Sequence, residues 1–295
     1  KAAIDAGYRH IDTAAVYGLG HSEEIVGRAL RRLPADERPL VFTKCGLEWD
    51  PDDPMKPARR LATPSSVRRS LESSLRRLGV ESLDLTQTHC IPTEHLQRGE
   101  VFEHLRELKR QGKIKSFGAS VESMDEALWC LGQEGLASLQ VIFNIFRQKP
   151  ADVLLAKAKE LGVAIIVRLP LASGLLSGKL NADTAFAPND HRSFNRDGQQ
   201  FNVGETFAGL PYARGVELAD MLKPLVPGRG TMAQFALRWC LDFDAVTTVI
   251  PGAKRPEQAR MNAEASGLDC LSKDLHCQLR RFYDEEVVPY IRGKY

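Results

Sequence analysis

Two patterns of apolar residues alternate along the chain, and together they predict a repeating order of strands and helices. Short apolar runs bounded by polar residues are typical of buried strands, and Val163–Val167 is the clearest, with almost only β-branched residues. Seven such runs are present. The predicted strands are Arg9–Thr13, Leu40–Lys44, Ser82–Gln87, Ile114–Ser120, Leu139–Phe143, Val163–Val167 and Ala245–Ile250.

Apolar residues at helical spacing predict a helix or crossover after each strand. One helix is predicted to begin after Thr63, which can cap it, with Pro64 in its first turn. An apolar stripe follows, and Gly79 ends the helix. Ser22 is the predicted cap of an earlier helix that runs to Leu30. The other clear helices are Met124–Leu131, Val153–Leu161, Val216–Leu222, Met232–Leu241 and Pro256–Ala265, and the polar stretch Asn181–Gly209 predicts a functional or mobile loop.

This order predicts an α/β protein with parallel strands, either an open doubly wound sheet or a closed barrel. Eight strands close a barrel, and the helix-like start that ends at Gly7 suggests that one strand precedes Lys1. No G-x-G-x-x-G follows the first strand, which argues against a doubly wound dinucleotide-binding sheet. We therefore predict a (β/α)8 TIM barrel, its first strand missing from this chain, with residues 1–295 as one domain.

Composition excludes several classes of protein. With 43% hydrophobic and 26% charged residues, the sequence is typical of a globular protein, and a net charge of +2 predicts no nucleic-acid partner. No apolar run is long enough to span a bilayer, and no signal peptide is visible. The six cysteines form no C-x-x-C or zinc-type spacing, which predicts reduced thiols, a cytoplasmic location and no metal site.

Four ionisable residues fall at or just after the ends of three successive predicted strands: Asp12 and Tyr17, then Lys44, then His89. In a barrel these ends are neighbours on one rim, so the four side chains are expected to converge. A lysine charge beside the phenol would lower the pKa of Tyr17, Asp12 would hold the lysine, and His89 would bind the same oxygen as Tyr17. Such a set suits protonation of a carbonyl oxygen during hydride transfer.

Each residue also has an ordinary structural interpretation. Asp12 could cap a turn and Tyr17 could pack on a loop, while Lys44 could be a rim lysine and His89 a loop histidine. The coincidence of all four at successive strand ends favours the catalytic hypothesis.

Collinear motifs across nearly the whole chain resemble those of the aldo-keto reductases. They are Asp12-Thr13-Ala14-x-x-Tyr17-Gly18, Thr43-Lys44, Asp84-Leu85-x-x-x-His89, Gly118-Ala119-Ser120, Pro170 to Lys179, and Ile250-Pro251-Gly252-Ala253-Lys254. The resemblance implies a TIM barrel that binds an extended nicotinamide cofactor, usually NADPH. It also implies that Tyr17 is the proton donor, that Lys44 and Asp12 tune it, and that His89 orients the substrate carbonyl.

The same resemblance implies cofactor positions along the chain. Ser120 and Gln140 would hold the nicotinamide carboxamide, although Val121 stands where the family often has Asn. Arg168 occupies the place of a Tyr that many members stack on the nicotinamide ring; it could stack likewise or form a structural ion pair. The pyrophosphate loop would use Pro170, Leu171, Ala172, Gly174, Leu176 and Lys179, and the adenosine end Gly252, Lys254, Gln258 and Asn262, with Met261 in place of a common Glu.

The leading hypothesis is an NADP-dependent reductase of small-molecule aldehydes or ketones. One alternative is a nicotinamide-binding sensor or auxiliary subunit with little turnover, since such proteins occur in the family. Another is a metal-dependent TIM-barrel hydrolase that uses His10 and Asp12, but no second histidine cluster supports it. The substrate and the oligomeric state are left open.

Overall fold

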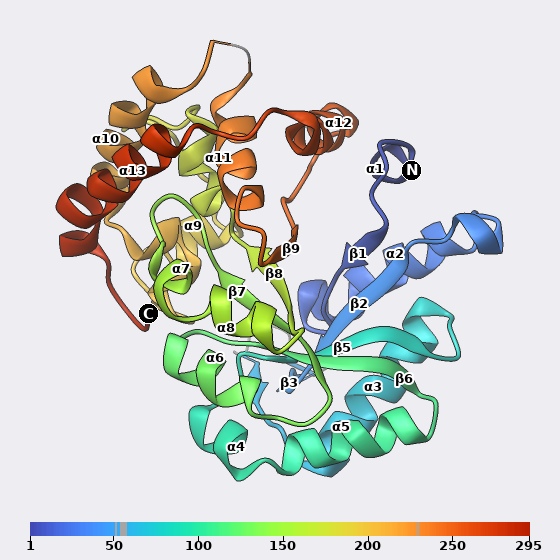
Figure 1. Ribbon diagram of the computed structural model, residues 1–295. Helices are drawn as coiled ribbons and strands as arrows, with labels where there is room; N and C mark the ends of the chain where they lie inside the picture. The colour runs from blue at the N-terminus through green and yellow to red at the C-terminus, as the bar shows by residue number, and fades with distance from the viewer. Residues whose placement is uncertain (51, 54–57, 229) are drawn as a thin grey trace. The chain divides into compact units, whose positions relative to one another are not determined.

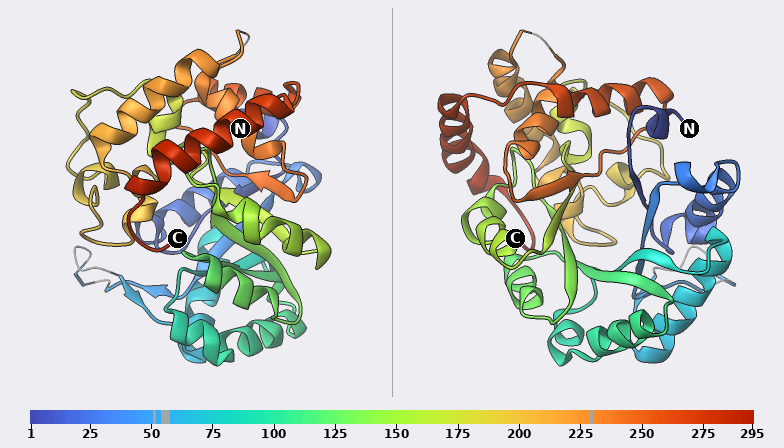
Figure 2. Two further views of the ribbon diagram at one scale, coloured as in Figure 1. Left: turned by 60° about the vertical axis from the view of Figure 1, so that its left-hand side comes forward. Right: turned by 45° about the vertical axis from the view of Figure 1, so that its right-hand side comes forward.

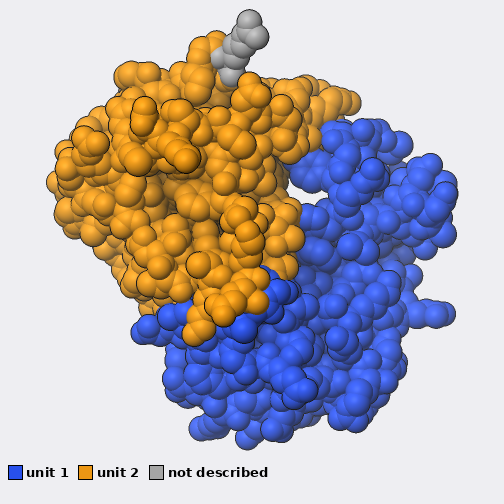
Figure 3. Space-filling model, viewed as in Figure 1, with its two compact units in different colours: residues 1–121, 125–140, 161–163 blue, residues 122–124, 141–160, 164–295 orange. Residues whose placement is uncertain are grey.

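The computed structural model describes residues 1–50, 52–53, 58–228 and 230–295. The chain divides into two compact units, which Figure 3 colours blue and orange. The first unit comprises residues 1–121, 125–140 and 161–163; the second comprises residues 122–124, 141–160 and 164–295. The assignment of residues 1–295 to a single domain stays a prediction.

Parallel strands form the centre of the first unit and run in the order β1-β2-β5-β6-β7. Each neighbouring pair is joined by a crossover, as the alternating pattern of the sequence predicts. The strands are β1 (His10–Asp12), β2 (Leu40–Cys45), β5 (Leu83–His89), β6 (Ile114–Ser120) and β7 (Leu136–Ile142), of which residues 136–140 belong to this unit.

The helices of this unit are α1 (Ala2–Asp5), α2 (His21–Leu30), α3 (Pro64–Leu78), α4 (Thr93–Arg98), α5 (Glu100–Arg110) and α6 (Met124–Leu131), with 3-10 turns η1 (Tyr17–Gly20) and η2 (Ala35–Glu37). Helix α3 packs on β2 and on α5, which in turn packs on β6, so both helices lie against the sheet (Figures 1 and 2). Their apolar stripes are buried, which is why the helical period is so clear in the sequence.

Local signals correctly predicted the limits of α3. The Thr63 side chain accepts a hydrogen bond from the Ser66 N–H at 3.3 Å, Pro64 occupies the first turn, and Gly79 ends the helix with a φ of 69°. The prediction that Ser22 caps α2 is wrong. Gly20, with a φ of 97°, precedes the helix, and the Ser22 hydroxyl instead hydrogen-bonds the Thr13 hydroxyl at 2.8 Å.

A short antiparallel pair lies between β2 and α3 in the sequence. It consists of β3 (Leu47–Glu48) and β4 (Arg59–Arg60), and its two-residue strands are too short to show an alternating pattern. No pattern in the sequence predicts this pair.

The second unit contains the parallel strands β8 (Ala164–Arg168) and β9 (Val246–Val249), with Ile165 opposite Val246 and Val167 opposite Val249. Its helices are α7 (Lys149–Val153), α8 (Leu155–Glu160), α9 (His191–Phe194), α10 (Tyr212–Leu222), α11 (Met232–Leu241), α12 (Pro256–Glu264) and α13 (Lys273–Phe282). The helix expected at 153–161 corresponds to α8, which α7 precedes. Short 3-10 and π segments complete the unit: η3 (Ala172–Ser177), η4 (Val203–Glu205), η5 (Phe207–Gly209), η6 (Lys223–Leu225), η7 (Ala265–Gly267), η8 (Tyr283–Val287) and η9 (Val288–Tyr290).

All seven predicted strands are present, and their limits differ from the predicted ones by at most a few residues. The stretch 181–209, which has little periodicity, contains only the one-turn α9, η4 and η5. Among the residues that the structure describes, no helix is both long enough and apolar enough to cross a membrane.

Candidate functional site

Strand register places the candidate site residues of the first unit on one face of its sheet. Lys44 pairs with Gln87, and His89 pairs with Ser120, which pairs with Gln140. Paired residues of a parallel sheet point to the same face, as do residues two apart on one strand. The same rule puts Asp12 on this face, because it pairs with Phe42, two residues before Lys44.

Asp12, at the end of β1, and Lys44, on β2, form a buried ion pair on this face. The Lys44 ammonium contacts the Asp12 carboxylate and donates to the Thr13 carbonyl oxygen at 2.9 Å. The second Asp12 carboxylate oxygen accepts a hydrogen bond from Gln140 Nε2 at 2.8 Å. The Lys44 side chain is 0% exposed and that of Asp12 is 7% exposed, so both charges depend on these partners for their stability.

Tyr17 and His89 lie beside this ion pair. Their rings meet edge to face with centroids 5.6 Å apart, and Lys44 Nζ lies 5.2 Å from the centroid of the Tyr17 ring. Tyr17 begins η1, the next element after β1, and is 43% exposed, whereas His89 is half-buried at the end of β5. The structure therefore brings together the four residues that the sequence placed at successive strand ends.

Ser120, the last residue of β6, and Gln140, within β7, are both buried. The Ser120 hydroxyl lies 3.6 Å from Cys90 Sγ, and the Val121 N–H donates to the Gln140 carbonyl oxygen at 3.2 Å. The sequence analysis assigned Gln140 to a cofactor contact alone and missed its hydrogen bond to Asp12. No local signal connects these two residues, which are 128 positions apart.

The thiol that directly follows Lys44 is not reactive. Burial raises the pKa of Cys45 to about 12, so the thiolate is scarce at neutral pH.

In the second unit, the predicted pyrophosphate run has an unusual backbone. Leu169, Ala172 and Ser173 have φ values of 53°, 47° and 56°, a region that side chains disfavour, and Gly174 has a φ of 102°. Internal bonds hold these turns, such as the Gly174 N–H to the Leu171 carbonyl oxygen at 2.8 Å. Strain of this kind gathers at ligand-binding sites, which supports the prediction for this run.

The residues of this run differ in exposure. Pro170, Ala172 and Leu176 are buried and anchor the run, Leu171 and Gly174 are half-buried, and Lys179 is exposed.

Of the predicted adenosine residues, Gly252 and Lys254 lie in the turn before α12, and Gln258 and Asn262 lie in α12 itself. The Gln258 side-chain oxygen accepts from the backbone N–H groups of Lys254 at 2.8 Å and Arg255 at 3.1 Å. Asn262 Nδ2 donates to the Gly252 carbonyl oxygen at 3.4 Å. Gln258 and Asn262 thus hold the backbone of the turn, and the Lys254 side chain extends from it into solvent.

Arg168, at the end of β8, forms an ion pair with Glu205 of η4. The Glu205 backbone oxygen accepts from the Ser173 hydroxyl at 3.3 Å, and that hydroxyl accepts from the Phe207 N–H at 3.1 Å. The sequence analysis allowed an ion pair for Arg168 but could not name its partner, because Glu205 lies in the stretch without periodicity. Of the two expected roles of Arg168, the ion pair is present, and Arg168 is only 8% exposed.

Arg147 is a second buried cation, and the sequence analysis did not identify it. Its guanidinium lies 4.1 Å from the centroid of the Tyr295 ring, and its Nη2 donates to the Lys294 carbonyl oxygen at 2.9 Å. Burial lowers the pKa of Arg147, and the proximity of Arg168 lowers it further, whereas Tyr295 and Glu205 raise it.

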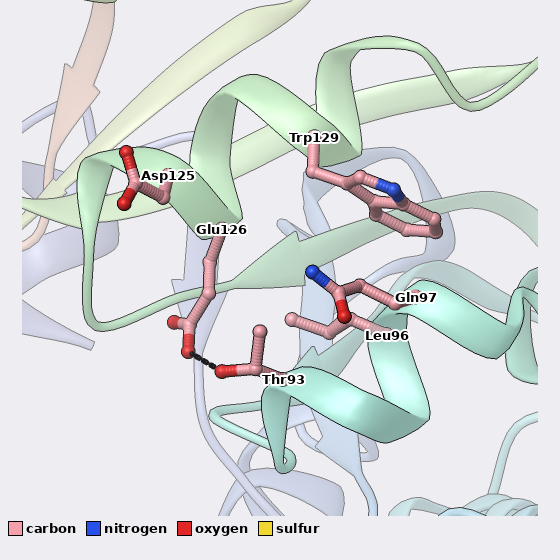
Figure 4. Close-up of a pocket in the computed structure, with 6 residues that line it drawn as sticks. All are labelled: Thr93, Leu96, Gln97, Asp125, Glu126 and Trp129. Atoms are coloured by element: carbon pink, nitrogen blue, oxygen red, sulfur yellow. Dashed lines mark hydrogen bonds between the residues drawn. The ribbon is translucent and has the colours of Figure 1, made fainter.

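A small surface pocket lies between α4 and α6 in the first unit (Figure 4). The Thr93 hydroxyl donates to the Glu126 carboxylate at 2.6 Å inside it, and Trp129 forms one wall. No predicted site residue lines this pocket, so its position gives no support to a catalytic role.

The chain is similar to known proteins over nearly its whole length. The sequence model of the Aldo/keto reductase family matches residues 1–284. An NADH-specific methylglyoxal reductase from Escherichia coli is 29% identical over 277 residues, which cover 91% of this chain and 81% of that protein.

Two solved structures show the same fold. A glycerol dehydrogenase from Gluconobacter oxydans has a TM-score of 0.81 and 32% identity, with 100% of this chain and 86% of that chain covered. An aldo-keto reductase from Klebsiella pneumoniae in complex with NADPH has a TM-score of 0.66 and 26% identity, with 96% of this chain and 82% of that chain covered. These similarities, together with the seven parallel strands, confirm the predicted fold class, the (β/α)8 barrel.

Proposed function

Because the chain belongs to the Aldo/keto reductase family, we propose that it is an NADP(H)-dependent oxidoreductase that reduces aldehydes or ketones to alcohols, with Tyr17 as the proton donor. The observation that carries this proposal is the cluster in the first unit, where the Tyr17 ring contacts His89 and lies over the buried Lys44–Asp12 pair. A phenol, a cation and an imidazole at one place suit proton transfer to a carbonyl oxygen.

Each residue of the cluster has a separate task in this proposal. The nicotinamide cofactor, when bound, supplies the hydride to the carbonyl carbon. Tyr17 donates its hydroxyl proton to the carbonyl oxygen, and the Lys44 ammonium stabilises the phenolate that remains. Asp12 and the Thr13 carbonyl oxygen hold that ammonium in place. His89 hydrogen-bonds the same substrate oxygen and so orients the carbonyl.

The residues present fit a nicotinamide dinucleotide. Buried Ser120 and Gln140 provide a hydroxyl and an amide for the carboxamide, at the same face as the catalytic cluster. The strained turns after Leu169 present successive backbone groups that suit a pyrophosphate, and the exposed ammonium of Lys254 suits a phosphate on the adenosine ribose.

Support for NADP over NAD comes from Lys254 and from the NADPH complex of the Klebsiella pneumoniae relative. The Escherichia coli relative is described as NADH-specific, so membership of the family alone does not decide the choice. We propose a small carbonyl compound as the partner. The cytoplasmic location and the lack of a nucleic-acid partner stay predictions from composition.

The test is a Tyr17→Phe variant assayed with a panel of aldehydes and ketones by the absorbance of NADPH. We expect kcat to fall roughly a hundredfold while NADPH binding, measured by fluorescence quenching, is nearly unchanged. Tyr8→Phe, the same change at a half-buried tyrosine of the same unit, is the control and is expected to keep wild-type kcat. Near-normal turnover of Tyr17→Phe would disprove the role of Tyr17, and a wild-type protein that binds NADPH but reduces no carbonyl would favour the sensor alternative.

A further inference from the structure

The carboxylate of Glu23, in the first turn of α2, is completely buried and joins three elements of the first unit. One of its oxygens accepts a hydrogen bond from the Thr43 hydroxyl of β2. The other accepts from Arg77 of α3, whose Nε lies at 2.7 Å and whose Nη2 lies at 2.6 Å. The Arg77 side chain is itself only 18% exposed. Because a buried charge depends on its partners, Glu23 fixes the start of α2 to both of these elements.

This link reaches the neighbours of the buried ion pair. Thr43 directly precedes Lys44 and faces away from the site, because adjacent residues of a strand point to opposite faces. The Ser22 hydroxyl hydrogen-bonds the Thr13 hydroxyl at 2.8 Å. The Thr13 carbonyl oxygen in turn accepts from Lys44 Nζ at 2.9 Å. Two consecutive residues of α2, Ser22 and Glu23, are therefore bonded to residues that adjoin the ion pair.

The segment between Tyr17 and α2 needs support because its backbone is strained. Leu19 and Gly20 have φ values of 55° and 97°, and this left-handed region is unfavourable for a leucine. Strained backbone persists only where its surroundings hold it. The Arg77 side chain lies against this segment, since a Cβ at Gly20 would be 2.9 Å from Arg77 Cδ. The arginine of the buried pair thus also packs on the segment that carries Tyr17.

We propose that Glu23 and Arg77 are positioning residues, which hold η1 so that the Tyr17 ring stays over Lys44. This inference rests on the proposed function, in which Tyr17 donates the proton. Neither positioning residue touches substrate or cofactor, and both act through the placement of Tyr17. A shift of about 1 Å in a reacting group can lower a rate by up to about a hundredfold, so loss of the link should be visible in kcat.

The test is the kcat of Glu23→Met, which removes both hydrogen-bonding oxygens and keeps a side chain of similar length. We expect kcat to fall about tenfold or more, with the dissociation constant of NADPH within about threefold of wild type. Glu23→Gln should keep most of the wild-type kcat, because its amide oxygen can accept from Arg77 and its amide nitrogen can donate to the Thr43 hydroxyl. Wild-type kcat in Glu23→Met, or an equal loss in both variants, would overturn the inference.

A double-mutant cycle shows whether Glu23 acts through Tyr17. Tyr17→Phe already lacks the proton donor, so the addition of Glu23→Met should change its kcat by less than about threefold. A role of Glu23 that does not involve Tyr17 would lower kcat by the same factor in both backgrounds and would overturn the inference. If Glu23→Met does not fold, Glu23→Met/Arg77→Met leaves no unpaired charge and should show the same loss and the same dependence on Tyr17.

Leu108→Ala is the control for a general loss of stability. Leu108 is 1% exposed near the end of α5, and its carbonyl oxygen accepts from the Lys113 N–H at 3.0 Å, directly before β6 begins. The start of a barrel strand lies opposite the site, so this variant should lower the urea midpoint and leave kcat unchanged. If Leu108→Ala were as slow as Glu23→Met, destabilisation alone would explain the loss and the inference would fail.

The outcomes separate the two proposals. Wild-type protein that reduces no carbonyl would overturn the proposed function and this inference with it. An active wild type, a slow Tyr17→Phe and a normal Glu23→Met would overturn this inference and leave the proposed function intact.

Discussion

Replacing Lys44 by Met tests the centre of the proposed site, because stability and catalysis should respond differently. Met fills nearly the same space and removes only the ammonium. The Asp12 side chain, which is 7% exposed, would then be a buried charge without its cation. Of the two contacts to its carboxylate described above, the hydrogen bond from Gln140 Nε2 at 2.8 Å would remain. Removing one partner of a buried pair destabilises a protein by about 3–5 kcal/mol, and the bond from Gln140 favours the lower end, about 3 kcal/mol.

Two further variants make this magnitude interpretable. Lys115→Met breaks a pair of similar length, 2.7 Å to Asp84, in the same unit, but the Lys115 side chain is 65% exposed. An exposed pair of this kind contributes about 0–1 kcal/mol. The double variant Asp12→Asn/Lys44→Met removes both buried charges and should regain most of the lost stability, because no unpaired charge remains.

Urea unfolding followed by circular dichroism gives the stability of each variant, and NADPH absorbance gives kcat. We expect Lys44→Met and the double variant to lose roughly a hundredfold or more in kcat, whatever their stability, because both lack the cation beside Tyr17. If Lys44→Met were no less stable than Lys115→Met, the buried pair would contribute nothing. If the double variant regained activity, Lys44 would have no catalytic role.

Two other predictions concern the cofactor and the packing of the first unit. Lys254→Ala should weaken NADPH binding about tenfold or more and NADH binding hardly at all, since only NADPH carries the ribose phosphate. Fluorescence titration with both cofactors measures the two affinities. Equal losses of affinity would show that Lys254 does not bind that phosphate. Gly118→Ala should lower the free energy of unfolding in urea by about 1–3 kcal/mol or more, because the added Cβ would lie 2.1 Å from Ser138 Oγ and 2.6 Å from the Ser138 carbonyl oxygen. The control is Gly132→Ala, where the nearest atom to the added Cβ is 3.4 Å away. This variant should change the free energy of unfolding by less than about 1 kcal/mol.

Features that depend on neighbours in sequence were predictable without the structure. The order of strands and helices follows from the two periods of apolar residues, and the limits of α3 follow from Thr63, Pro64 and Gly79. The grouping of Asp12, Tyr17, Lys44 and His89 was also predictable, because parallel strands that are connected by crossovers end at one edge of a sheet.

Contacts between side chains far apart in sequence required the tertiary structure. Only strand register brings Gln140 to Asp12, and only the course of the chain after β8 brings Glu205 to Arg168, 37 positions away. The start of α2 belongs here too, since the Ser22 hydroxyl binds Thr13 rather than capping its own helix. Local sequence carries the propensity and the period of each element, but which polar groups satisfy one another is decided by packing, because a buried charge or hydroxyl takes whichever partner the fold brings within reach.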